Sequence, residues 1–139
     1  MEIIAVALQT VQAGQNVYFT DEVTCGNCAI SHRDGSGLVT LRGVTNQCRA
    51  RFKISFGGNI AIPTGGTVEP ITLALAIDGE AVPSTTTIYT PAAVEAFGNV
   101  FTAIFVDVPR NCCQTISVQN TSTQPIEIQN ANLIIERTS

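Results

Sequence analysis

Hydrophobic and polar residues alternate along much of the chain, and the alternation comes in runs bounded by turn residues. Residues 51–62 place two phenylalanines and an isoleucine at every second position, and residues 70–77 and 100–108 repeat this period of two. A period of two is typical of a β-strand that buries one face. The pattern therefore predicts three strands that cover a common core.

Shorter runs rich in β-branched and aromatic residues predict further strands at residues 3–8, 17–19, 38–41, 82–90, 115–119, 126–128 and 133–137. Asp78-Gly79 stands between two apolar runs, which is a strong hairpin signal. The Gly57-Gly58 pair predicts a bulge or a bend inside its strand. Short strands with turn signals at this spacing indicate a β-sandwich or a barrel.

One segment departs from the strand pattern. Residues 91–98 contain helix-forming residues, with Thr90 as a candidate cap and Pro91 at the first helical position. We expect at most one or two helical turns there, on a loop. No linker or internal repeat divides the chain, so a single domain over residues 1–139 is predicted, with residues 1–20 as a first strand or an N-terminal docking arm.

Five motifs together resemble a known family: Phe52-x-Ile54-x-Phe56, Leu73-x-Leu75-x-Ile77-Asp78-Gly79, Val100 to Pro109, Thr115 to Ser122, and Ala131-x-Leu133-Ile134-Ile135. They are similar to the C1q/TNF-like jelly rolls, in particular to bacterial and phage members such as the C-terminal domain of spore-surface collagen-like glycoproteins. The resemblance covers about residues 50–139. It implies an all-β jelly-roll sandwich that assembles as a homotrimer around a threefold axis. The residues expected between its two sheets are Ile71, Leu73, Leu75, Ile77, Ile104, Val106, Ile116 and Val118.

The chain carries few charges. Charged residues make up 13% of it and hydrophobic residues 45%, whereas about 25% charged residues is typical of soluble domains. Either neutral polar residues cover the surface, or much of the surface packs against sister subunits, where charges are depleted. We favour the second interpretation.

Composition also argues against two classes of partner. The net charge is −4 with a single lysine, so there is no basic run for nucleic acid. No apolar stretch approaches the roughly 20 residues of a membrane-spanning helix. The nearest basic cluster is Arg42, Arg49 and Arg51, which we interpret as solvated or interface charges.

The cysteines are the residues with the most candidate chemistry: Cys25, Cys28, Cys48, Cys112 and Cys113. Cys25 and Cys28 form a C-x-x-C pair which, with His32 and Cys48, supplies the ligand types of a Cys₃His zinc site. That spacing is weak, so no metal is our first expectation. We favour at least one disulfide, within or between subunits; one of the adjacent cysteines could face the core while the other reaches a neighbouring segment or subunit. Reduced, buried cysteines are the alternative.

No motif indicates catalysis or a cofactor. His32 has the context of a solvated loop residue, no G-x-S-x-G elbow is present, and the scattered acids form no calcium loop. We therefore expect no enzyme, no catalytic residues and no cofactor. The chain lacks a collagen-like stalk, and its first residues lack the features of a signal peptide.

These observations favour a non-enzymatic structural virion protein, namely a trimeric capsid decoration protein or a head- or tail-fibre module of a phage. Its surface loops or residues 1–20 would dock on other virion structural proteins, such as the major capsid protein. The alternative is a receptor- or carbohydrate-binding module on a spore or cell surface. The scarcity of aromatic residues, with two Tyr and no Trp, weakens sugar stacking.

Overall fold

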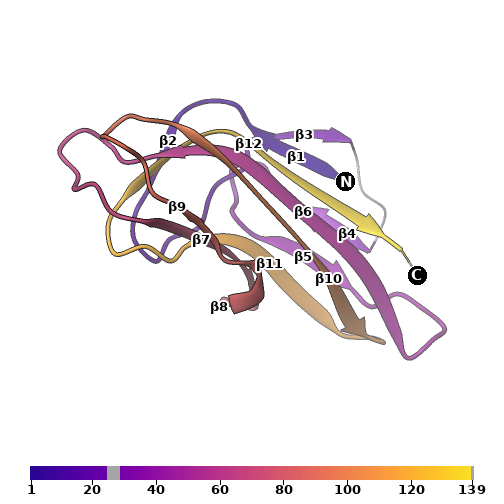
Figure 1. Ribbon diagram of the computed structural model, residues 1–139. Coiled ribbons are helices and arrows are strands. Elements are labelled where there is room, and N and C mark those ends of the chain that lie inside the picture. The colour runs from indigo at the N-terminus through magenta and orange to yellow at the C-terminus, as the bar shows by residue number, and fades with distance from the viewer. Residues whose placement is uncertain (25–28, 139) are drawn as a thin grey trace.

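Two antiparallel sheets pack face to face in the computed structural model, which describes residues 1–24 and 29–138 (Figure 1). Sheet A contains, in spatial order, β10 (Gly98–Pro109), β6 (Arg49–Ala61), β12 (Ile126–Arg137), β1 (Glu2–Ala5) and β3 (Asp21–Thr24), and β2 (Gln9–Val11) pairs with β12. Sheet B contains β4 (Ile30–His32), β5 (Val39–Arg42), β11 (Cys113–Asn120), β7 (Ile71–Ile77) and β8 (Glu80–Ala81), and β9 (Thr87–Tyr89) pairs with β7. The all-β sandwich predicted from the sequence is confirmed.

The core lies between the inward faces of the two sheets. On β6, Phe52, Ile54 and Phe56 are fully buried, as their period of two predicts. Among the residues expected in the core, Ile71, Leu73, Leu75, Val106, Ile116 and Val118 are buried, while Ile77 and Ile104 are partly buried against it. Each fully buried side chain of this size contributes about 1.5–3 kcal/mol, so these strands supply much of the driving force for folding.

The predicted hairpin at Asp78-Gly79 is confirmed. Both residues have positive φ, 53° and 86°, and Ile77 pairs with Glu80 across the turn. Two positive φ angles define the turn type whose twist matches that of the flanking strands. The Asp78 carboxylate also accepts a 2.8 Å hydrogen bond from the Thr115 backbone N–H, which joins the turn to the neighbouring strand β11.

The bulge predicted at Gly57-Gly58 is wrong, because it lies in the partner strand. The pairing of β6 with β10 runs without a break through both glycines, whereas β12 shifts register between Gln129 and Asn132. A Cβ on Gly58 would approach the Cα of Ala131 to 3.5 Å and Cδ1 of Ile128 to 3.3 Å. The glycine therefore makes room for a bulge that is formed opposite it.

The loop predicted for residues 91–98 is present over residues 91–97, and it contains no helical turn. Glu95 has φ of 63°, a left-handed conformation outside the helical region, and its N–H donates to the Ile62 carbonyl at 2.8 Å. Its carboxylate accepts a 2.8 Å hydrogen bond from the Thr64 hydroxyl. These bonds fix the segment as a loop over the end of β6, and they outweigh its helix propensity.

A short 3₁₀ helix, η1 (Pro83–Thr85), interrupts the strand predicted over residues 82–90, of which residues 87–89 remain as β9. Within the described residues, no helix is long and apolar enough to cross a membrane.

The N-terminal segment belongs to sheet A. Strands β1 and β2 both pair with β12, and the Met1 ammonium donates a 2.7 Å hydrogen bond to the Ile135 carbonyl. Figure 1 shows both termini toward the same end of the sandwich, where the loop after β5 and the turn after β10 also lie.

Candidate functional site

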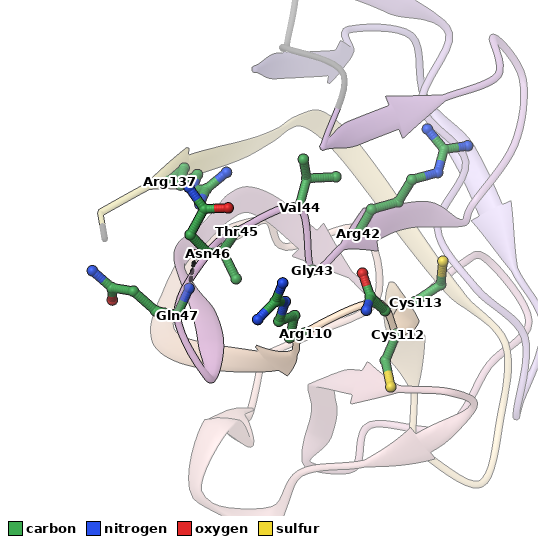
Figure 2. A pocket seen from close by; sticks show the side chains of 11 residues that line it. Arg42, Gly43, Val44, Thr45, Asn46, Gln47, Arg110, Cys112, Cys113 and Arg137 are labelled. Atoms are coloured by element: carbon green, nitrogen blue, oxygen red, sulfur yellow. Dashed lines mark hydrogen bonds between the residues drawn. The ribbon is translucent and has the colours of Figure 1, made fainter.

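A hollow of about 740 Å³ opens at this end of the sandwich (Figure 2). It lies between the loop that joins β5 to β6 and the turn that joins β10 to β11. The residues that line it are Arg42, Gly43, Val44, Thr45, Asn46, Gln47, Arg110, Asn111, Cys112, Cys113 and Arg137. Three separate segments of the chain therefore build it, namely residues 42–47, residues 110–113 and the end of β12.

Backbone hydrogen bonds hold the two loops together. The Gly43 N–H donates to the Cys112 carbonyl at 2.8 Å, and the Asn111 N–H donates to the Gly43 carbonyl at 3.1 Å. The Arg110 N–H donates to the Cys48 carbonyl at 2.9 Å. A Cβ at position 43 would lie 2.1 Å from the carbonyl oxygen of Pro109. Only glycine permits this close approach.

The side chains around the hollow are basic and neutral polar. Arg42 lies at the end of β5, Arg110 in the turn after β10, and Arg137 at the end of β12. No aspartate or glutamate lines the hollow. Figure 2 shows Arg110 between the 45–47 segment and Cys112, while Arg42 lies on the other side of Gly43 and points away from Arg110.

Asp107, three residues before Arg110 in the sequence, is paired with two other arginines. Asp107 on β10 forms ion pairs with Arg51 at 2.8 Å and with Arg49 at 3.1 Å. The hydrogen bond from Arg51 lowers the pKa of Asp107, and the same bond raises the pKa of Arg51. Arg49 and Arg51, which the sequence left as solvated or interface charges, are thus surface partners of Asp107.

The described cysteines gather near this end. Cys112 and Cys113 line the hollow, and Cys48 lies in the β5–β6 loop; all three are free thiols and exposed. The expectation that one of the adjacent pair faces the core is wrong, because Cys112 is in the turn and Cys113 pairs with Arg42 at the margin of sheet B. The alternative prediction of reduced, buried cysteines is also wrong for these three, because they are exposed. Cys25 and Cys28 lie outside the described residues.

His32 is not the solvated loop residue that the sequence predicted. It ends β4 and is half-buried, and its Nε2–H donates to the Ser36 carbonyl at 2.9 Å. Its Nδ1 is buried without a hydrogen-bond partner in the structure. Across residues 1–24 and 29–138, no three His, Cys, Asp or Glu side chains come close enough to hold a metal ion.

Sequence reasoning missed Arg110 and Arg137 as members of a site. They are far from Arg42 in the sequence, and neither has another basic residue beside it. Their position in the chain was a signal that could have identified them, because Arg110 follows a strand and Arg137 ends one. Without the strand directions, nothing showed that these ends meet.

A second surface feature lies on the outer face of sheet A, and we call it the sheet A patch: Phe101, Ala103 and Phe105 on β10 with Ile134 on β12. Residues directly opposite one another on paired strands share a face. Ala103 pairs with Ser55, and Ser55 pairs with Ile134, so these three form one row across the sheet.

Small residues lie between the large apolar side chains of the patch. Phe101 pairs with Gly57, and its ring lies 3.7 Å from where a Cβ on that glycine would be. Phe101 and Phe105 are 65% and 60% exposed, and Ile134 is 41% exposed. The outer face of sheet A therefore combines exposed apolar side chains with small residues, and the charged Lys53 lies opposite Phe105.

Comparison with known proteins supports the fold. No protein-family model and no curated protein matches the chain. Among solved structures, the globular domain of zebrafish complement 1qA protein is similar over 96% of this chain and 93% of its own, with a TM-score of 0.54 and 8% identity. The chain thus has a C1q-like jelly-roll fold.

Two weaker similarities are to the C-terminal domain of EclA, a sugar-binding protein, and to a family 35 carbohydrate binding module from Clostridium thermocellum. The first has a TM-score of 0.43 and 14% identity, over 95% of this chain and 80% of the other. The second has a TM-score of 0.36 and 9% identity, over 93% of this chain and 98% of the other. These scores are too low to support an argument about this chain.

Proposed function

We propose that the chain is a non-enzymatic assembly module that forms a homotrimer through the sheet A patch. The observation that carries the proposal is the exposure of Phe101 and Phe105 on the face of a regular strand. Aromatic side chains are enriched in subunit interfaces, and contiguous exposed apolar patches mark interaction sites.

The distribution of charge around the patch supports the same proposal. The three residues of its central row, Ala103, Ser55 and Ile134, carry no charge, and the nearest charged residues are Glu2 beside Ile134 and Lys53 opposite Phe105. The ion pairs of Asp107 with Arg49 and Arg51 lie farther along the same strands. An uncharged centre with a polar rim is the usual anatomy of a stable interface, which buries about 1,200–2,000 Å² in total.

For the setting, we propose a phage particle, in which the trimer serves as a capsid decoration protein or as a head- or tail-fibre module. It would dock on other virion structural proteins, such as the major capsid protein. The low charged fraction of 13% supports a protein with much of its surface in contact with neighbours. Capsid and portal genes beside the coding gene would support this setting, and spore-coat or glycosyltransferase genes would oppose it.

The trimer is tested by light scattering after size exclusion, in the presence of reductant so that thiol cross-links cannot contribute. We expect a mass three times the 14.7 kDa of the chain. Phe101→Glu and Phe105→Glu should shift the protein to monomer, because each buries a charge in the interface. Ile88→Glu is the matched control, since Ile88 is 71% exposed on β9 of the other sheet. A wild-type protein that is monomeric at high concentration would refute the trimer.

A second candidate function is that of a receptor- or carbohydrate-binding module on a spore or cell surface. The hollow favours it, because a concave site with convergent polar side chains is the usual form of a ligand site. Binding of the wild-type protein to immobilised polysaccharides, with loss of binding on substitution of a residue that lines the hollow, would support this candidate.

A further inference from the structure

We propose that the hollow binds a small polyhydroxylated molecule that carries one oxyanion, namely a carboxylate, sulfate or phosphate, and that Arg110 is its main anion contact. The proposal names the ligand class of the binding-module candidate and rests on that candidate. It does not depend on the trimer, because a single chain supplies every residue of the site.

The charge of the hollow selects an anion. Arg110 lies in it between the 45–47 segment and Cys112 (Figure 2), and no Asp or Glu is among the described residues that line it, in a chain with a net charge of −4. Guanidinium groups bind carboxylate, sulfate and phosphate through paired N–H donors, and these charge-assisted bonds are among the strongest in proteins. A ligand with an oxyanion is therefore favoured over a neutral or cationic one.

The neutral side chains select hydroxyl groups. Thr45, Asn46, Gln47 and Asn111 line the same hollow, and their hydroxyl and amide groups both donate and accept. The backbone N–H groups of Gly43, Arg110 and Asn111 are already bonded between the two loops, and that of Cys112 is bonded to the Pro109 carbonyl within its own turn. Recognition of a ligand here is thus left to side chains, which suits the donor and acceptor pattern of sugar hydroxyls.

The lining contains no aromatic residue, so a sugar ring has no face to stack on and the oxyanion must supply much of the affinity. The volume of about 740 Å³ lies within the roughly 300–1,000 Å³ of ordinary ligand pockets. It accommodates a monosaccharide derivative with some bridging water.

Calorimetric titration of the wild-type protein tests the proposal with glucuronate, glucose 6-sulfate, glucose 6-phosphate, glucose, and inorganic sulfate and phosphate. We expect the three charged sugars to bind, glucose to bind at least about tenfold more weakly, and the inorganic ions to bind more weakly than the sugars that carry them. Equal affinity for glucose, or no binding of any charged sugar at about 10 mM, would overturn the proposal. Equal affinity for the inorganic ion would also overturn it, since the site would then be an ion site.

Arg110→Gln should lower the affinity for the charged sugars by about tenfold or more. Arg33→Gln removes the same charge from the β4–β5 turn, outside the hollow, and should leave affinity unchanged. Each variant is checked for folding by its thermal transition. A folded Arg110→Gln protein with wild-type affinity would contradict the proposed role of Arg110.

A second measurement needs no variant. Cys112 and Cys113 line the hollow, whereas Cys48 is exposed outside it. Saturating charged sugar should slow alkylation of Cys112 and Cys113 and leave that of Cys48 unchanged, as read by peptide mass spectrometry. Sugar binding without selective protection would place the ligand elsewhere. That outcome overturns the inference but leaves a binding module intact, whereas binding to no saccharide defeats both.

Discussion

The carboxyl group of Glu127 on β12 hydrogen-bonds that of Glu95, which lies on the loop over the end of β6. Glu127 is only 7% exposed, and this burial raises its pKa, with the bond to Glu95 acting in the same direction. Hydrogen bonds from Thr64 and Glu127 lower the pKa of Glu95. The pair is therefore most favourable with one proton, held on Glu127.

This pair predicts a specific pH dependence. A raised pKa in the folded state gives stability that is present below the unfolded value of 4.5 and is lost as pH rises through the folded pKa. A lowered pKa acts in the opposite sense, so the contribution of Glu95 is lost as pH falls below 4.5. Glu127→Gln, whose amide keeps a donor for Glu95, should remove the loss of stability that follows as pH rises above 4.5.

Urea denaturation at several pH values from acid to neutral measures this effect. Glu80→Gln in the β7–β8 hairpin is the control. Because Glu80 is exposed, this substitution should leave the pH profile of stability as it is in the wild-type protein. A Glu127→Gln protein with an unchanged pH profile would show that the carboxyl pair does not contribute to stability.

Gly43→Ala should destabilise the protein and disturb the hollow. The added methyl group would lie 2.1 Å from the Pro109 carbonyl oxygen, so the two loops must separate. Overpacking of this kind costs about 1–3 kcal/mol, measurable as a lower denaturation midpoint. Gly57→Ala is the control, since its nearest neighbour lies at 3.7 Å; similar losses in both variants would argue against a specific clash.

Thr85→Val should cost about 1–3 kcal/mol. The buried Thr85 hydroxyl accepts a 2.9 Å hydrogen bond from the Leu75 N–H and donates at 2.7 Å to the Val82 carbonyl. Valine has the same shape and would leave the Leu75 N–H without a partner between β8 and β9. Thr86→Val, at an exposed neighbour, should be nearly neutral, and equal midpoints for the two variants would contradict the prediction.

Iodoacetamide should alkylate Cys48, Cys112 and Cys113 in the native protein, because all three are exposed thiols. Peptide mass spectrometry after brief labelling, with and without urea, measures the rates. We expect urea to change these rates little. A large acceleration in urea at any of the three would show that the native fold shields that thiol. An intersubunit bridge through one of them stays a prediction, which non-reducing gels test.

The strands were predictable because burial imposes a simple period on each of them. Phe52, Ile54 and Phe56 alternate with polar residues and face the core, and the Asp78-Gly79 turn needs no more than its two residues to be recognised. The resemblance to C1q-like jelly rolls then joined these local elements in the correct architecture.

The sequence was least informative where long-range contacts decide local structure. Residues 91–97 are a loop because Glu95 binds Thr64, a partner some thirty residues earlier. The hollow escaped prediction for the same reason. Arg42, Arg110 and Arg137 line one hollow only because antiparallel strands bring the ends of β5, β10 and β12 to one margin of the sandwich.

The hydrogen bond from the Met1 ammonium to the Ile135 carbonyl has a practical consequence for handling the protein. Arg137 lines the hollow, so a tag or surface tether on either terminus stands close to the hollow's rim. Immobilisation through a terminus therefore turns the hollow toward the support and presents the opposite loops to the solution. Measurements of binding to the hollow are better made with the protein anchored through those opposite loops, for example at the exposed Gly65 turn.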